Sequence, residues 1–140
     1  MRPMVFEHFL GKDVCGAEDE VRSVLGKTKD GKNEFMIYTD SSSDSEFPCI
    51  SVLVKGDYAY IWYTHSENLA GYQAYGEDLG LDPNGSTIFY INTGTEEMYI
   101  PNRYVNTKER VLQAVLEFMN FSKWPISYEE LPACVEWEEL

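Results

Sequence analysis

The first residues with the spacing of a catalytic site are His65-Ser66-Glu67. They have the H-x-E order of a zinc deaminase, in which the histidine binds the metal and the glutamate moves protons. Such a site also needs P-C-x-x-C downstream. Pro48-Cys49 lies upstream without a second cysteine, and Pro132-Ala133-Cys134 does not complete the motif. Because the sequence has two histidines and no C-x-x-C, we expect no metal site.

Other catalytic patterns are missing from the sequence or incomplete. There is no G-x-G-x-x-G, Walker A or G-x-S-x-G motif. Acidic pairs occur at 77–78, 96–97 and 129–130, but neighbouring residues on a strand point to opposite faces. A glycosidase needs two acids facing each other across a sugar, which a sequence alone does not show. We therefore expect no catalytic residues and no cofactor, with a small deaminase-like or hydrolytic enzyme kept as an alternative.

The charge of the chain is strongly negative. Its formal net charge is −13, and residues 33–102 contain eleven acidic side chains but a single base, Lys55. A field of one sign accelerates encounter with an oppositely charged protein. It opposes binding to nucleic acid or to an anionic membrane, because both are polyanions. We expect a basic protein partner, although a merely solvated acidic surface explains the same composition.

Length and composition predict one globular domain over residues 1–140. The chain has 44% hydrophobic residues, and a domain of this size buries roughly two thirds of its unfolded surface. It contains no apolar run of about 18 residues and no signal-like N-terminal segment. Cys15, Cys49 and Cys134 are odd in number and far apart, which favours reduced thiols and a cytoplasmic protein. One structural disulfide remains an alternative.

Two segments have helical patterns. Residues 17–25 begin with acids, continue with Val21, Val24 and Leu25 at helical spacing, and end at Gly26. The second helix is predicted to begin at Asn106 as its cap, with Glu109 in a capping box, and to fade near residue 122. Its apolar stripe comprises Val111, Leu112, Val115, Leu116 and Met119.

The clearest strand signal is the hairpin at residues 49–63. Two β-rich runs flank Gly56-Asp57, and glycine at the first central position suits a type II′ turn. The turn places Val54 opposite Ala59, Val52 opposite Ile61 and Ile50 opposite Tyr63. This aliphatic face is predicted to meet the helices.

Further strands are expected at 34–39, within 71–75, at 86–92, at 96–101 and at 133–137. The segment 40–46 is expected to be a polar loop, and 82–85 a turn. In the last strand, Val135 and Trp137 are predicted to face the core. These elements predict an α+β fold, a mainly antiparallel sheet with two helices packed on one face.

The second face of the hairpin carries Leu53, Tyr58, Tyr60 and Trp62. Large amphipathic rings of this kind either lie beneath another part of the chain or form a binding surface. The next segment, 65–85, is rich in carboxylates, glycines and tyrosines. Aromatic rings that become buried within an acidic rim are suited to a tight protein interface.

The order of several segments resembles a known family. "VKGDYAYIWY" is followed by "MYIPNRYV", by "TKERVLQAVLEFM" and by a terminal "P-x-x-V-E-W-E-E". This order is similar to that of the first-numbered immunity family of bacterial polymorphic toxin systems, over roughly residues 34–140. The nearest parts are Gly56–Ala59 and Val135–Glu138.

The resemblance implies a small acidic cytosolic protein that is not an enzyme. Members of that family bind a cognate toxin domain, often a deaminase, and block its active site or substrate groove. It implies a 1:1 heterodimer with a basic toxin domain, and no nucleic acid, membrane or cofactor. Because the shared motifs look like scaffold, the contact residues are predicted from this sequence alone. They are Tyr58, Tyr60, Trp62, Glu67, Tyr72, Tyr75, Glu77, Asp78 and Asp82. A general acidic adaptor of the Smi1/Knr4-like type is the alternative.

Overall fold

The computed structural model describes residues 3–39, 47–66 and 70–140, and its strands form two antiparallel sheets. The larger sheet has the strand order β10-β6-β5-β4-β3-β1-β2, and β9 also pairs with β5. Its strands are β1 (Met4–His8), β2 (Gly11–Cys15), β3 (Lys32–Thr39), β4 (Cys49–Lys55), β5 (Tyr58–Thr64), β6 (Tyr72–Ala74), β9 (Asn106–Thr107) and β10 (Trp137–Glu139). The smaller sheet is a hairpin of β7 (Ser86–Ile91) and β8 (Glu96–Pro101).

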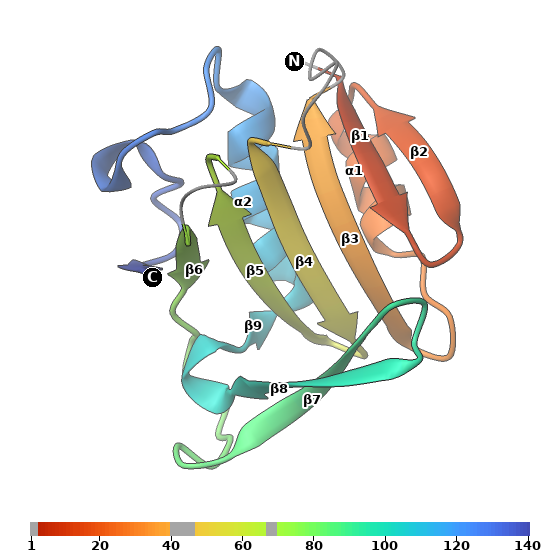
Figure 1. Cartoon of the computed structure of the whole chain (residues 1–140), viewed down its shortest axis with the longest axis vertical. Coiled ribbons are helices and arrows are strands. Elements are labelled where there is room, and N and C mark those ends of the chain that lie inside the picture. Colours follow the sequence, from red (N-terminus) through yellow and green to blue (C-terminus); the bar gives the residue numbers. More distant parts are fainter. Residues whose placement is uncertain (1–2, 40–46, 67–69) are drawn as a thin grey trace.

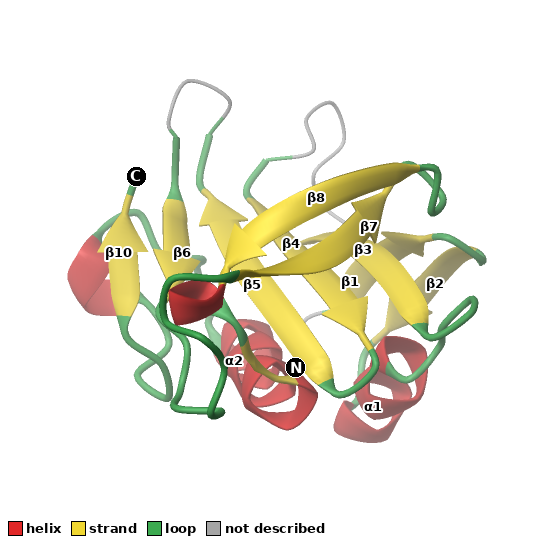
Figure 2. Cartoon of the chain, turned by 90° about the horizontal axis from the view of Figure 1, so that it is seen from below, coloured by secondary structure: helices red, strands yellow, loops and turns green. Residues whose placement is uncertain are grey.

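The large sheet is covered differently on its two faces. Helices α1 (Glu18–Leu25) and α2 (Lys108–Asn120) lie on one face, and the β7–β8 hairpin crosses the other (Figure 1, Figure 2). Short 3₁₀ helices η1 (Asn102–Tyr104) and η2 (Tyr128–Glu130) complete the elements. The predicted α+β fold, with a mainly antiparallel sheet and two helices on one face, is confirmed.

The β4–β5 turn has the predicted geometry. Gly56 has φ of +57°, and Asp57 is not among the residues with positive φ, as a type II′ turn requires. Val54 pairs with Ala59, and the two other predicted pairs also form. The turn therefore sets which side chains of β4 and β5 face the helices.

The helix-side core is built on that aliphatic face. The buried side chains of both helices meet those of β4 and β5 in one cluster. Tyr63 is fully buried, and its hydroxyl donates to the carbonyl oxygen of Pro125 at 2.6 Å. The ring of Phe118 contacts the rings of Tyr63, Trp124 and Trp137. The end of the chain is thus tied to the centre of the sheet, and Val135 and Trp137 do face this core as predicted.

A second core fills the space between the sheet and the β7–β8 hairpin. Leu53 and Tyr60 from the sheet meet Phe89 and Ile100 from the hairpin, together with Tyr104 and Val105. Of the two interpretations of the ring-bearing face, cover by another part of the chain is therefore correct for Tyr60. The hairpin is the cover because its Phe89 is fully buried and its Ile100 is buried in the same cluster as Tyr60.

Two predicted boundaries are wrong by a few residues. Thr107, not Asn106, caps α2, and its hydroxyl accepts from the backbone N–H of Arg110 at 3.3 Å. Asn106 instead pairs with Ala59 in the short strand β9 and is buried. The last strand is Trp137–Glu139 rather than 133–137, because β6 offers partners only to these residues.

Replacing Phe89 with alanine tests whether the hairpin is packed as a second core. Because the ring is fully buried, we expect Phe89→Ala to lower the free energy of unfolding by about 3–5 kcal/mol in urea denaturation. Tyr99, on the outer face of the same hairpin and 62% exposed, is the control. Tyr99→Ala should change stability by less than about 0.5 kcal/mol. Equal losses for the two variants would contradict the packing.

Candidate functional site

One row of side chains crosses the sheet face that the hairpin leaves open. Each member pairs with its neighbour on the adjacent strand, so that the row runs without a gap from β2 to β10. We call it the open-face row. All members except the exposed Lys12 are half-buried. It consists of Lys12, Glu7, Met36, Ser51, Trp62, Gln73 and Glu138.

The β10 end of this row is a carboxylate held by three donors. The hydroxyl of Tyr104 and the side-chain amide of Gln73 donate to Oε1 of Glu138 at 2.8 and 2.9 Å. The Tyr75 hydroxyl donates to Oε2 at 2.8 Å. Gln73 is itself fixed, because its Oε1 accepts from the buried hydroxyl of Tyr60 at 2.8 Å. The last strand is thereby joined to β6, β5 and η1 through one side chain.

These hydrogen bonds change the acidities of the groups involved. The amide of Gln73 and the hydroxyls of Tyr75 and Tyr104 lower the pKa of Glu138, and the charge of Arg103 adds to this. The same bond to Glu138 raises the pKa of Tyr75. Glu138 is therefore ionised and Tyr75 protonated throughout the neutral pH range.

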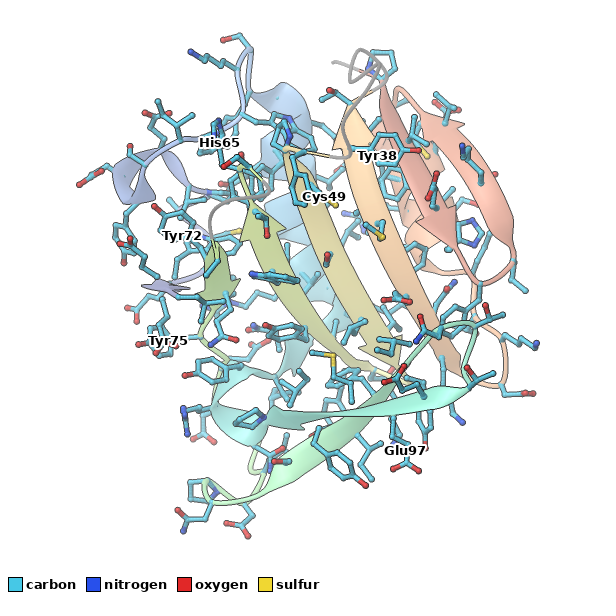
Figure 3. The ribbon with its side chains drawn as sticks, in the orientation of Figure 1. Tyr38, Cys49, His65, Tyr72, Tyr75 and Glu97 are labelled. Atoms are coloured by element: carbon cyan, nitrogen blue, oxygen red, sulfur yellow. The ribbon has the colours of Figure 1, made fainter. Side chains whose placement is uncertain are left out.

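The β2 end of the row also carries a carboxylate, but its charge is balanced. Glu7 accepts from the Tyr38 hydroxyl at 2.6 Å and forms an ion pair with Lys12 at 3.2 Å. Glu138, by contrast, has no Lys, Arg or His within 4.0 Å in the described part of the chain. Figure 3 shows Tyr38 and Tyr75 on opposite sides of the open face. Of the two ends of the row, the Tyr75 end presents the carboxylate that no described Lys, Arg or His approaches within 4.0 Å.

The three aromatic side chains of β5 that were predicted to contact the partner differ in their exposure. Tyr60 is 5% exposed beneath the hairpin, so this predicted contact residue cannot touch a partner. Tyr58 is half-buried and packs against the same core. Trp62 is half-buried in the open-face row, and its indole N–H donates to the carbonyl oxygen of Ala70 at 2.9 Å. Trp62 is thus the β5 ring best placed for contact.

The two predicted tyrosines of β6 lie on opposite faces of the sheet edge. Tyr75 follows β6 on the open side and is 36% exposed. Tyr72 packs against the helix-side core, with its ring centroid 6.4 Å from that of Tyr128 in η2. Both labelled rings mark the same edge in Figure 3. They do not form a single surface patch.

The side chain of Glu77 forms hydrogen bonds within the protein. One of its carboxylate oxygens accepts from the backbone N–H and the hydroxyl of Thr107, at 2.9 and 2.7 Å. Burial alone would raise the pKa of Glu77, but these bonds and the charge of Arg110 together lower it. Because the carboxylate lies at the N-terminus of α2, it stabilises the start of the helix. Glu77 therefore has a structural role, and its predicted contact with a partner stays a prediction.

The remaining predicted acids belong to the loop 76–85. Asp78 and Asp82 accept backbone N–H groups two residues ahead, which is ordinary turn chemistry. The loop begins at Gly76, whose N–H donates to the carbonyl oxygen of Arg103 at 2.6 Å. A side chain at Gly76 would collide with the backbone of Val105, so the approach requires glycine. Glu67 lies outside the described residues.

Sequence reasoning missed the central members of the site. Glu138, Gln73, Tyr104 and Arg103 are not among the contact residues predicted from the sequence. One sequence pattern could have identified Glu138. Neighbouring residues on a strand point to opposite faces, so if Trp137 faces the helix-side core, Glu138 faces the other side of the sheet. No sequence signal pairs β10 with β6.

Of the H-x-E motif, the structure describes His65 and Ser66 but not Glu67. His65 is half-buried just after β5, while Cys49 is buried at the start of the neighbouring strand. Within residues 3–39, 47–66 and 70–140, no three His, Cys, Asp or Glu side chains gather as metal ligands would. Cys15, Cys49 and Cys134 all lie within the described residues, and none of them forms a disulfide. Of the helices described, none is long and apolar enough to cross a membrane.

Comparison with known proteins does not place the chain in a family. A scan against models of protein families and a search of curated proteins both find no match.

The pKa of Glu138 gives a direct test of the hydrogen-bonded site. We expect NMR titration to place it below the ordinary 4.5, and Tyr75→Phe and Tyr104→Phe each to raise it. Because folding lowers this pKa, its contribution to stability is complete above the unfolded value and is lost as pH falls through the folded one. Tyr99→Phe is the control, since the Tyr99 hydroxyl bonds to Glu97 instead. An unchanged Glu138 pKa in both site variants would contradict the network.

Proposed function

We propose that this protein is an immunity protein, which binds a basic toxin domain and occludes its active site or substrate groove. The observation that carries the proposal is that the open-face row ends at the carboxylate of Glu138, which no described Lys, Arg or His approaches within 4.0 Å. The resemblance of the segment order supports it independently. The strongly negative charge of the whole chain supports the basic character of the partner.

Further carboxylates gather around the same edge of the sheet. Glu136 and Glu139 flank Glu138 in the chain and are exposed. Burial raises the pKa of Tyr72, and the charges of Glu139 and Glu129 raise it further. The charges of Glu139 and Glu129 thus make the electrostatic potential negative where β6, β10 and η2 meet. We call these three elements the C-terminal edge.

An acidic edge beside exposed rings suits inhibition of a nucleic-acid-directed toxin. Deaminases and nucleases that act on DNA or RNA bind a polyanion in a basic groove. An inhibitor with carboxylates at its contact surface competes for the same groove. The exposed ring of Tyr75 and the half-buried ring of Trp62 supply the apolar contact that charge alone does not.

Co-expression tests the proposed function. The gene next to the one encoding this protein should encode a toxin domain that arrests growth when expressed alone. Expression of this protein with that domain should restore growth, and the two should elute together at a 1:1 ratio. A catalytically inactive toxin variant controls for expression load. Binding to other proteins without any relief of toxicity would instead favour the adaptor alternative.

Salt dependence tests the contribution of charge. We expect the association rate with the toxin domain to fall by about tenfold or more between low and high ionic strength. The reason is that screening removes long-range attraction between a chain of net charge −13 and a basic groove. Surface plasmon resonance at several NaCl concentrations measures this rate. A rate independent of salt would remove the electrostatic part of the proposal.

A further inference from the structure

The described residues leave one hydrogen-bonding position of the Glu138 carboxylate unused. An ionised carboxylate offers about four acceptor positions, two on each oxygen. Within residues 3–39, 47–66 and 70–140, Oε1 accepts from Gln73 and Tyr104, whereas Oε2 accepts only from Tyr75. The side chain is half-buried in the open-face row, so the remaining position on Oε2 is within reach of another molecule.

We propose that Glu138 and the exposed ring of Tyr75 form a receptor for one arginine side chain of the protein partner. The guanidinium would donate an N–H to Oε2 of Glu138 and lie against the ring of Tyr75. The identity of the partner rests on the proposed function, but the arginine specificity of the site does not. It follows from the chemistry of these two residues.

The receptor is fixed before any ligand arrives. The rings of Tyr75 and Tyr104 lie with centroids 5.8 Å apart and planes inclined by 31°, and both hydroxyls hold Glu138. Gln73 is anchored from the other side by the buried Tyr60. A carboxylate restrained in this way loses little conformational freedom on binding, so less of the interaction energy is spent on ordering.

The aromatic pair favours arginine over lysine. Guanidinium groups stack on aromatic rings and are more weakly hydrated than ammonium groups. The same pair already receives one guanidinium from within the chain, since the Arg103 side chain lies 4.8 Å from the centroid of the Tyr104 ring. Arg103 does not reach ion-pairing distance of Glu138. The neighbouring ring, Tyr75, is 36% exposed and remains accessible.

Three other carboxylates with several partners among the described residues are already paired with cations. Asp13 binds Lys27 at 2.9 Å, Glu7 binds Lys12, and Glu77 lies 3.8 Å from Arg110. Glu138 combines three neutral donors, a lowered pKa and no cation within 4.0 Å among the described residues. That combination stabilises a negative charge without neutralising it, which suits a site that receives a cation from outside.

NMR titration with N-acetyl-arginine methylamide tests the site without a toxin. The Gln73 side-chain amide signals and the Tyr75 ring signals are the reporters, because both groups contact Glu138. We expect saturable shifts of both in the wild type. The citrulline analogue, which keeps the shape but lacks the charge, should produce no saturable shift. The lysine analogue should bind at least about threefold more weakly than arginine, because it stacks less well.

Glu138→Gln and Glu136→Gln form a matched pair of variants. Both remove one charge within two residues of each other near the end of the chain, but Glu136, just before β10, is exposed and is not held by the tyrosine pair. Saturable binding of the arginine analogue should be lost in Glu138→Gln, read from the Tyr75 ring, and kept in Glu136→Gln. Equal weakening in both variants would show a general electrostatic attraction and overturn the proposal. Absence of saturable shifts in the wild type, or equal shifts with citrulline, would overturn it too.

The toxin domain provides a second, separate measurement. We expect Glu138→Gln to weaken toxin binding by about tenfold to a hundredfold, and Glu136→Gln by less than about threefold. Thermal unfolding of both variants shows whether a loss of affinity reflects a loss of folding. Wild-type protein that binds no toxin would defeat the proposed function, and the arginine titration would still decide the receptor. Toxin binding that is insensitive to Glu138→Gln would defeat the receptor alone.

Discussion

Burial of β4 and β5 on both faces is the constraint on which the rest of the structure depends. Their Val52 and Ile61 face the helices, while Leu53 and Tyr60 face the β7–β8 hairpin. A shift of one residue in their pairing would exchange the two sets and place aromatic rings where the helices need small aliphatic contacts. The two-residue turn at Gly56 prevents that shift. Each further layer packs against a surface that this turn has already determined.

The local part of this arrangement was predictable from the sequence. Hairpin register follows from the Gly56-Asp57 turn, and the apolar stripes of both helices follow from periodicity. The position of the β7–β8 hairpin was not predictable, because its cover of Tyr60 depends on the course of the chain through loop 76–85. The cap of α2 was misplaced for a similar reason. Thr107 is held by Glu77, thirty residues earlier, and no local pattern contains that contact.

In the candidate site, too, local patterns were predictable and contacts between distant segments were not. Five of the last seventeen residues are acidic, and composition treats them as equivalent. Only the pairing of β10 with β6 distinguishes Glu138, because it brings the carboxylate to Gln73 and the two tyrosine hydroxyls. Trp62 was identified from its place in the hairpin, whereas Tyr60 was assigned to the same surface although it is buried. Alternation along a strand identifies the face but does not show how much of that face another layer covers.

The placement of the site on the last strand has an energetic consequence. Hydrogen bonds from Tyr75, Tyr104 and Gln73 hold β10 against the sheet, and these same bonds keep the Glu138 carboxylate ionised and oriented. A carboxylate already bonded to three donors has lost part of its hydration when the protein folds. A partner cation then has less water to displace from Glu138, so the desolvation cost that normally offsets an interfacial ion pair is partly met by folding. The interactions that fasten this end of the chain therefore also prepare its charge for binding.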